Sequence, residues 1–264
     1  MMVTNSPSGK TLHEILCEEI AYSDRFNFCI SFILSSGLSL IIEKIKNALQ
    51  EGARVRILTS DYLYVTQPAA LKTLKKELER FEGQLQVKVY NAQSERELQS
   101  FHSKGYIFHY NPKKPLDSTR LQQDAQGSII VGSANLSRQG IKTGIEWSIF
   151  ITEHVLVQKA DDEFNILWEN ARAHPLTELL LQKYSQSYIN FHQIRLAVEK
   201  KGKLNPDNGV SITPNEIQAE AFDQLTDLHQ KGVKKAAVVL ATGLGKTFLA
   251  AFDFQRSRSH GLLF

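Results

Sequence analysis

The sequence predicts an α/β fold in which a mixed, largely parallel sheet is flanked by helices. Up to residue 90, short apolar runs rich in β-formers alternate with longer amphipathic stretches, the pattern of a mainly parallel sheet covered on its faces. From residue 101 to 152 the expected strands follow one another, which makes the sheet mixed. With 264 residues, 42% of them apolar and 22% charged, the chain is long enough for one large domain or two modest ones.

Helix capping and apolar periodicity predict the elements of the first ninety residues. Thr11, with Glu14 three residues on, is expected to cap a helix that runs to about Ile20. The elements expected after it are a strand over 26–34, a helix over 38–49 that stops at Gly52, a strand around 55–57, a helix over 68–81 followed by Gly83, and a strand over 85–90.

The second half of the chain contains the predicted domain boundary. The elements expected here are strands over 101–110, 128–131 and 146–152 and helices over 155–171 and 176–184. Around residues 199–209 the composition shifts to Lys, Gly, Asn, Asp and Pro, which is typical of a linker. We therefore expect a first domain over 1–185, a linker over 186–210 and the start of a second domain over 211–264.

The bulk properties exclude several classes of protein. The net charge of +3 permits a polyanionic partner without requiring one. The chain has two cysteines, Cys17 and Cys29, too few for a disulfide framework or a thiolate metal site. No apolar run approaches membrane-spanning length and the polar start is not a secretory signal, so we expect a cytoplasmic protein with no membrane partner. The eight histidines show no metal-ligand spacing, so no metal is expected.

One group of residues carries the chemistry of the first domain. His102 and Lys104 lie on one face of an expected strand, because strand side chains repeat every second residue. Ser133 and Asn135 follow the next apolar strand, and Glu146 opens the one after it. We expect Trp147 and Trp168 in the core rather than as platforms for stacked bases.

These residue types suit phosphodiester cleavage. A neutral imidazole can attack phosphorus and form a phosphohistidine that water later resolves. A nearby lysine, hydroxyl or amide can hold the non-bridging oxygens, and a carboxylate on the other imidazole nitrogen can fix its tautomer. Taken singly, the His–Lys pair is more often a surface pair, and Ser and Asn more often form turns. The combination in this order favours a site.

The motif H-x-K, followed by G-S-x-N and a Glu, resembles the nuclease branch of the phospholipase D superfamily. Segments 57–62, 66–71 and 146–147 extend the similarity to the nuclease-like domain that precedes superfamily-two helicases in certain bacterial proteins, over roughly residues 12–184. The resemblance implies a phospholipase-D-like fold and a metal-independent reaction. It assigns His102 as nucleophile, Lys104, Ser133 and Asn135 as phosphate ligands, and Glu146 as the partner of His102.

The family builds its active site from two facing motifs, and this chain has one. The resemblance therefore implies a homodimer in which one His102 attacks while the other protonates the leaving oxygen. The more familiar form of the motif carries an Asp a few residues after the Lys, and this chain has none there, which disfavours a phospholipid hydrolase. The main alternative is a catalytically silent module that binds DNA.

A second group of residues, near the end of the chain, predicts a phosphate-binding loop. An apolar strand over 236–240 runs into Thr242-Gly243-Leu244-Gly245-Lys246-Thr247. The glycines let backbone N–H groups surround a phosphate, while the lysine and the last threonine suit the outer phosphates and magnesium. The loop resembles that of superfamily-two helicases, and Gln218 resembles the glutamine with which they read adenine.

These resemblances together predict a nuclease joined to a helicase motor. ATP and magnesium are the cofactors expected for an intact motor. No acidic magnesium-binding strand, arginine finger or second motor lobe follows, so we expect a truncated P-loop helicase segment that hydrolyses no ATP by itself. The expected partner is DNA, with RNA as the alternative, in restriction, defence or repair.

Overall fold

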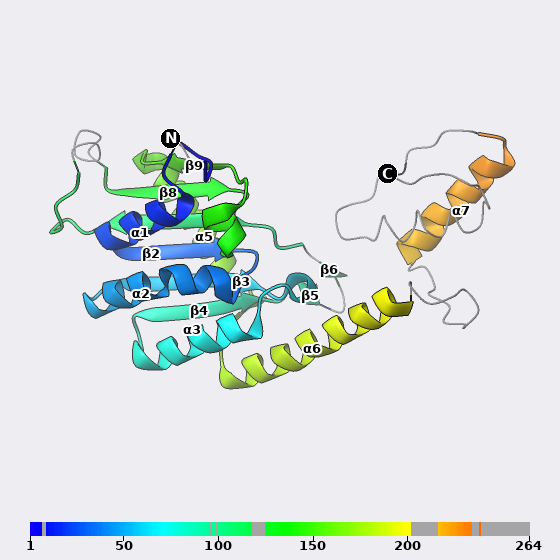
Figure 1. Ribbon diagram of the computed structural model, residues 1–264, viewed down its shortest axis with the longest axis horizontal. Helices are drawn as coiled ribbons and strands as arrows, with labels where there is room; N and C mark the ends of the chain where they lie inside the picture. The colour runs from blue at the N-terminus through cyan, green and yellow to red at the C-terminus, as the bar shows by residue number, and fades with distance from the viewer. Residues whose placement is uncertain are drawn as a thin grey trace. The chain divides into compact units, whose positions relative to one another are not determined.

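In the computed structural model, an eight-stranded mixed sheet forms the centre of the first part of the chain (Figure 1). The structure describes residues 1–6, 9–94, 97–98, 100–117, 125–201, 216–233 and 238. The chain divides into two units, Met1–Glu199 and Lys200–Phe264, and the sheet belongs to the first.

The strand order across this sheet is β1-β9-β8-β7-β2-β3-β4-β10. In chain order the strands are β1 (Met2–Val3), β2 (Ser23–Ile30), β3 (Arg54–Ser60), β4 (Leu85–Tyr90), β7 (Lys104–Tyr110), β8 (Gly127–Gly132), β9 (Ser148–Ile151) and β10 (Ala173–Pro175). A separate hairpin consists of β5 (Gln93–Ser94) and β6 (Glu97–Leu98).

The sheet is parallel only where helices connect its strands. β2 pairs with β3, and β3 with β4, in parallel. The five other pairings are antiparallel, including the long pairing of β2 with β7. The predicted mixed sheet flanked by helices is confirmed, but the prediction that it is largely parallel is wrong. From β7 to β9 the strands return without a crossover helix, and neighbours joined in that way run antiparallel.

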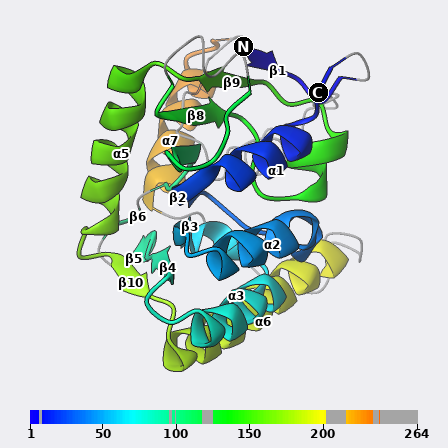
Figure 2. The same ribbon diagram turned by 90° about the vertical axis from the view of Figure 1, so that its left-hand side faces the viewer.

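Helices cover both faces of the sheet (Figure 2). α1 (Leu12–Tyr22), α2 (Ser35–Gln50) and α3 (Pro68–Arg80) lie over one face, and α5 (His154–Trp168) lies over the other. Alternate residues of the central strands therefore enter two cores. Phe26, Phe28, Tyr106 and Phe108 pack with the first group of helices, whereas Ile107 packs with α5.

The helix ends follow the capping signals in part. The predicted capping box is present, because the Thr11 side chain accepts from the Glu14 backbone and the Glu14 carboxylate accepts from the Thr11 backbone.

The domain boundary lies in a region where the structure has a long helix. α6 (Glu178–Lys201) runs across residues 186–201, which we assigned to the linker. The three domain ranges stay a prediction. The second unit contains α7 (Glu216–Gln230).

Two short helical turns complete the described elements. They are the 3-10 turn η1 (Tyr62–Tyr64) and the π-helical turn η2 (Gln139–Thr143). In the part of the chain that the structure describes, no helix combines the length and the apolar character needed to cross a membrane.

Candidate active site

Lys104 is the buried cation of the site. It is the first residue of β7 and the register neighbour of Ile30, the last residue of β2. Its side chain is buried, and Nζ donates to Ser31 Oγ at 3.1 Å and to the His102 carbonyl at 2.8 Å. Nζ also lies 2.9 Å from His102 Nδ1. Hydroxyl, carbonyl and imidazole groups thus hold the ammonium in place.

His102 precedes the strand in which it was expected. β7 begins at Lys104, so His102 lies in the connecting segment and its side chain is exposed. The segment is fixed on both sides of His102. Phe101 is buried against Tyr90, with ring centroids 5.0 Å apart, and Ser31 donates from its backbone N–H to the Ser103 carbonyl at 2.8 Å. The predicted meeting of His102 and Lys104 therefore occurs through loop geometry rather than through strand periodicity.

The electrostatics of this pair favour an unprotonated imidazole. Partial burial lowers the pKa of His102 below its ordinary value of 6.5, and the neighbouring Lys104 charge lowers it further. Burial lowers the pKa of Lys104 as well, while the charge of Glu146 opposes that effect. Among the described residues no carboxylate forms an ion pair with Lys104, so its positive charge is available to a phosphate.

Ser133 and Glu146 form a second pair. Ser133 follows β8, and its Oγ donates to the Glu146 carboxylate. The Ser133 backbone N–H donates to the Trp147 carbonyl at 3.0 Å, which joins the end of β8 to the segment before β9. Gly132 permits this approach, since a Cβ atom there would lie 2.3 Å from the Trp147 carbonyl oxygen. Glu146 was expected to open a strand, but β9 begins at Ser148 and Glu146 lies in the loop.

Asn135 is buried and holds the loop that follows β8 in place. Its Oδ1 accepts from the Phe32 backbone N–H at 3.2 Å, and the Leu34 N–H donates to the Leu136 carbonyl at 2.9 Å. Gly37, near the start of α2, packs directly on Leu136, because a Cβ atom at Gly37 would lie 2.4 Å from the Leu136 backbone. The loop after β8 is thereby fastened to the end of β2.

The structure thus forms two pairs from the five predicted residues. His102 contacts Lys104, and Ser133 contacts Glu146. Within the described residues, Glu146 has no hydrogen bond or ion pair with His102. Glu146 is near enough for its charge to act on Lys104. Burial raises the pKa of Tyr106, and the charge of Glu146 raises it further. The assigned pairing of Glu146 with His102, like the five assigned roles, stays a prediction.

Two residues near the site were not predicted to be there. Ser31 bonds Lys104, and the Ser31 carbonyl accepts from Ser60 Oγ at 2.8 Å. A serine at the end of an apolar strand is a weak signal, because hydroxyls are common there. Trp168 is buried as expected, but Trp147 is 66% exposed, which corrects its prediction as a core residue. Its strand starts one residue later, at Ser148, so no alternation directs the indole inward.

The predicted phosphate-binding loop belongs to the second unit. Thr242, Gly243, Gly245, Lys246 and Thr247 lie outside the residues that the structure describes. Gln218 lies in α7, but its side chain is outside the described part. Among the described residues, no group of three or more His, Cys, Asp or Glu side chains is arranged so that it could hold a metal ion.

Three of the solved structures that resemble the chain show the range of the similarity. NucT from Helicobacter pylori has a TM-score of 0.49 at 13% identity, over 66% of this chain and 97% of NucT. Nuc from Salmonella typhimurium, a phospholipase D family member, has a TM-score of 0.44 at 12% identity, over 66% and 95% of the two chains. Phosphatidylserine synthase of Haemophilus influenzae Rd KW20 has a TM-score of 0.47 at 17% identity, over 74% of this chain and 45% of the synthase.

The sequence also matches two protein families. Comparison with curated proteins gives no match. Residues 211–264 match the family described as the type III restriction enzyme, res subunit. Residues 16–168, more than half of the chain, match the family described as cardiolipin synthase, PLD-like domain. That range contains the whole His102–Lys104 and Ser133–Glu146 arrangement, and the chain therefore belongs to the PLD-like family.

Proposed function

We propose that the chain is a metal-independent phosphodiesterase that cleaves DNA through a phosphohistidine at His102. The observation that carries this proposal is the Lys104 ammonium, which is buried, unpaired by any described carboxylate and 2.9 Å from the His102 ring. A phosphodiester would supply the anionic partner that no described carboxylate provides for this cation. RNA is the alternative substrate, because nothing in the site distinguishes the two sugars.

The reaction proceeds in two balanced steps. His102 Nε2 attacks phosphorus, a P–N bond forms, and the P–O bond to the leaving strand breaks as that oxygen takes a proton. Water then attacks phosphorus, gives up a proton, and the P–N bond breaks. In our proposal the imidazole of a second copy of the chain supplies the first proton and accepts the second.

The tautomer that the Lys104 contact implies has to change before attack. Nδ1 of His102 faces the Lys104 ammonium, so it accepts and the ring proton resides on Nε2. We propose that a bound phosphate draws the ammonium away, that Nε2 gives its proton to water while Nδ1 takes one from water, and that Glu146 then accepts from Nδ1–H. Nε2 becomes the nucleophile, and Ser133, released from Glu146, donates to a phosphate oxygen.

Exposed apolar side chains beside the site support a homodimer. Ile145 is 93% exposed and Trp147 is 66% exposed, one on each side of Glu146. Val131 and Ile149 on the adjoining strands are also exposed. Apolar surface next to a site that needs a second histidine suits a second copy of the chain. In sedimentation velocity Ile145→Lys should shift the protein towards monomer, whereas Ile166→Lys, an equally large change on exposed α5 surface, should not.

The alternative function is a catalytically silent module that binds DNA. The Ser133–Glu146 hydrogen bond favours it, because it occupies the carboxylate that His102 needs. Cleavage of labelled single- and double-stranded DNA in EDTA separates the two functions. We expect the wild type to cut and His102→Ala to cut at least about 1,000-fold more slowly. DNA binding without cleavage by both proteins contradicts the enzyme and supports the module.

The remaining proposals concern the second unit. We propose that residues 211–264 belong to a helicase-type motor that uses ATP and magnesium and delivers DNA to the nuclease. Lys246 and Thr247 would hold the phosphates and the metal, and Gln218 the adenine. The match of this range to the restriction-enzyme res subunit supports the proposal.

A further inference from the structure

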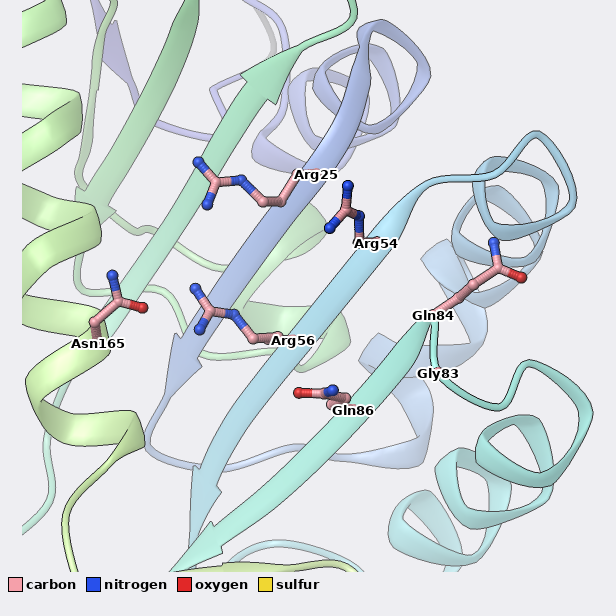
Figure 3. Close-up of a pocket in the computed structure, with 7 residues that line it drawn as sticks. All are labelled: Arg25, Arg54, Arg56, Gly83, Gln84, Gln86 and Asn165. Atoms are coloured by element: carbon pink, nitrogen blue, oxygen red, sulfur yellow. The ribbon is translucent and has the colours of Figure 1, made fainter.

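A second group of cations lies at the amino ends of β2 and β3. Arg25 of β2 is the register neighbour of Arg54 of β3, and Asn27 is the register neighbour of Arg56. Residues two apart on a strand share a face, so all four side chains rise from the same side of the sheet, and Figure 3 shows this for the three arginines. Adjacent guanidinium groups repel one another, and an anion bound between them removes that repulsion.

These arginines line a cavity of about 270 Å³. Its lining consists of Arg25, Arg54, Arg56, Gly83, Gln84, Gln86 and Asn165. Every polar side chain among these described residues is a guanidinium or an amide. Figure 3 shows the arginines and Gln86 standing on neighbouring strands, with Asn165 projecting from α5. The cavity thus offers many N–H donors and no carboxylate, which is the donor set for an oxyanion.

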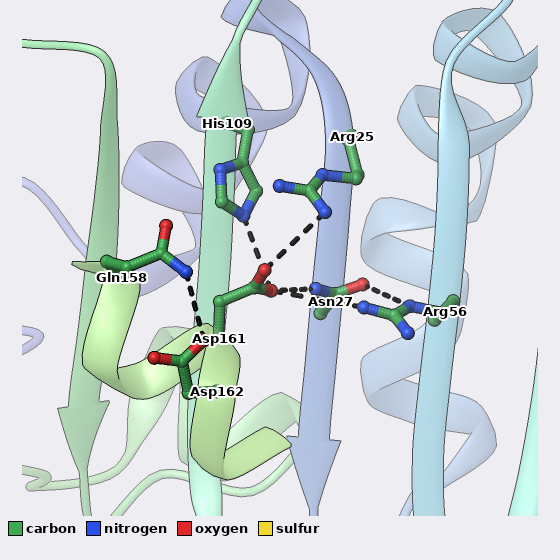
Figure 4. A network of polar contacts seen from close by, with 7 residues as sticks. All are labelled: Arg25, Asn27, Arg56, His109, Gln158, Asp161 and Asp162. Atoms are coloured by element: carbon green, nitrogen blue, oxygen red, sulfur yellow. Dashed lines mark hydrogen bonds and ion pairs between the residues drawn. The ribbon is translucent and has the colours of Figure 1, made fainter. Parts of the chain in front are cut away.

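One buried carboxylate near the cavity satisfies part of this charge. Asp161 of α5 accepts from Asn27 Nδ2 at 2.6 Å and forms ion pairs with Arg25 at 3.5 Å and Arg56 at 3.9 Å (Figure 4). His109 Nε2 lies 3.4 Å from the same carboxylate. A single negative charge is therefore shared by two arginines and a histidine.

Arg54 is the cation that remains without a partner. Its side chain is exposed, and among the described residues its guanidinium has no hydrogen bond or ion pair. Asp24, which is exposed, lines an adjoining hollow with Arg25 and Arg54. The charge of Glu169 also acts on Arg56, so the surroundings of the three guanidinium groups include three carboxylates, although none of these lines the cavity itself.

Arg56 is already held in position for a ligand. Its Nε donates to Asn27 Oδ1 at 3.0 Å, and its guanidinium lies 4.9 Å from the Phe164 ring centroid and 5.5 Å from that of Trp168. Little side-chain entropy is lost when a group fixed in this way binds an anion. Guanidinium groups also match the geometry of phosphate oxygens better than ammonium groups do.

We propose that this cavity is a second phosphate-binding site, separate from the catalytic site. The phosphate is carried either by a nucleic-acid backbone or by a free phosphate compound such as a nucleotide, and both present the same oxygens to the arginines. Arg25 is five residues from Ile30, the neighbour of Lys104, so the two sites lie roughly 17 Å apart along β2. The cavity is independent of catalysis at His102.

The test follows arginine Nε–H signals by NMR in the full chain carrying His102→Ala, which keeps DNA intact. Inorganic pyrophosphate is titrated first and a short single-stranded DNA oligonucleotide second. The signals of Arg25, Arg54 and Arg56 should shift together and saturate. Arg54→Gln should weaken binding about tenfold or more, because one charge-assisted contact is lost. Lys76→Gln, the loss of one exposed positive charge on α3, should leave the affinity unchanged.

Each outcome of the titrations supports or overturns the site. Saturation by both ligands identifies nucleic acid as a source of the phosphate, and saturation by pyrophosphate alone identifies a free phosphate compound. If neither ligand shifts these signals, or if Lys76→Gln weakens binding as much as Arg54→Gln, the proposed site is wrong. Because cleavage is measured separately on the wild type, failure here is distinguishable from failure of the catalytic proposal.

Discussion

At the carboxyl end of β2 the buried cation is Lys104, whereas at the amino end the cations are Arg25 and Arg56, arranged around Asp161. Lys104 is held by neutral groups alone, namely a hydroxyl, a carbonyl and an imidazole. The arginines instead share a carboxylate supplied by α5. Both ends of one strand therefore concentrate positive charge, but only at the amino end does an ion-paired carboxylate compensate part of it.

This difference separates a reactive arrangement from a mainly structural one. A buried ammonium without a carboxylate costs free energy in the unliganded protein, and a bound phosphate removes that cost. Removal of a buried carboxylate from several cationic neighbours leaves their charges uncompensated, and this destabilises the folded chain. The variants below test each half of the comparison.

Of the variants that test this comparison, Lys104→Met should have the largest effect. It removes the charge while keeping an unbranched side chain of similar length, and we expect DNA cleavage to fall by about 100-fold or more in single-turnover assays. The pKa of His102 should also rise towards 6.5 in an NMR titration, because one of the two causes that lower it is lost.

Lys88→Met is the matched control for this change. Lys88 lies in the same sheet, where its Nζ donates to the Trp168 carbonyl, and its loss should leave both cleavage and the His102 titration unaltered. Cleavage by Lys104→Met at the wild-type rate would show that the buried ammonium has no part in the reaction.

Asp161→Asn should have the next largest effect, on stability. It leaves Arg25 and Arg56 without their shared anion, which lowers the free energy of unfolding by about 3 kcal/mol for a fully buried pair. Water screens the partly exposed Arg25, so the loss is expected below that figure. Urea unfolding at neutral pH measures it, with Asp162→Asn, an exposed carboxylate on the same helix, as control.

The difference in stability between wild type and Asp161→Asn has a defined pH dependence. Burial by itself raises the pKa of Asp161, but the contact with His109 and the charges of His109 and the arginines outweigh it, so the pKa lies below 3.8. A lowered folded-state pKa stabilises the protein above the unfolded value and loses that effect as pH falls through the folded value. The stability difference between wild type and Asp161→Asn should therefore shrink below about pH 3.8. A difference that grows on acidification contradicts this assignment.

Ser31→Ala should have the smallest effect. It deletes the hydroxyl that accepts from Lys104 and donates to the Ser103 carbonyl at 3.0 Å. We expect a loss of about 1 kcal/mol in urea unfolding and a few-fold slower cleavage, since the other two contacts of the ammonium remain. Ser39→Ala on the exposed surface of α2 should change neither measurement.

The sequence predicted the elements better than their connections. Local signals, such as the capping box at Thr11 and the β4 strand, were confirmed because they depend on neighbouring residues. The antiparallel pairing of β2 with β7 depends on segments about eighty residues apart, and alternating elements do not reveal it. Likewise the meeting of His102 with Lys104 was anticipated, but the hydrogen bond between Ser133 and Glu146 was not.

The arginine cavity was missed even though a signal was present. Arg54 and Arg56 alternate with apolar residues in β3, and Arg25 and Asn27 alternate in β2. Period-two polar positions on strands otherwise buried on both faces mark a polar patch on one face. The partner Asp161 lies 134 residues from Asn27, so only the folded chain brings the carboxylate to these residues.

The positions of the two tryptophans allow the two ends of the sheet to be observed separately by fluorescence. Trp147 is exposed beside Glu146, and Trp168 is buried under the Arg56 guanidinium. The chain contains no other tryptophan. Emission from water-exposed Trp147 should shift when nucleic acid or a second copy covers the catalytic end, whereas emission from Trp168 should respond when an anion binds Arg56. Each single Trp→Phe variant would then report the occupancy of one end without an added label.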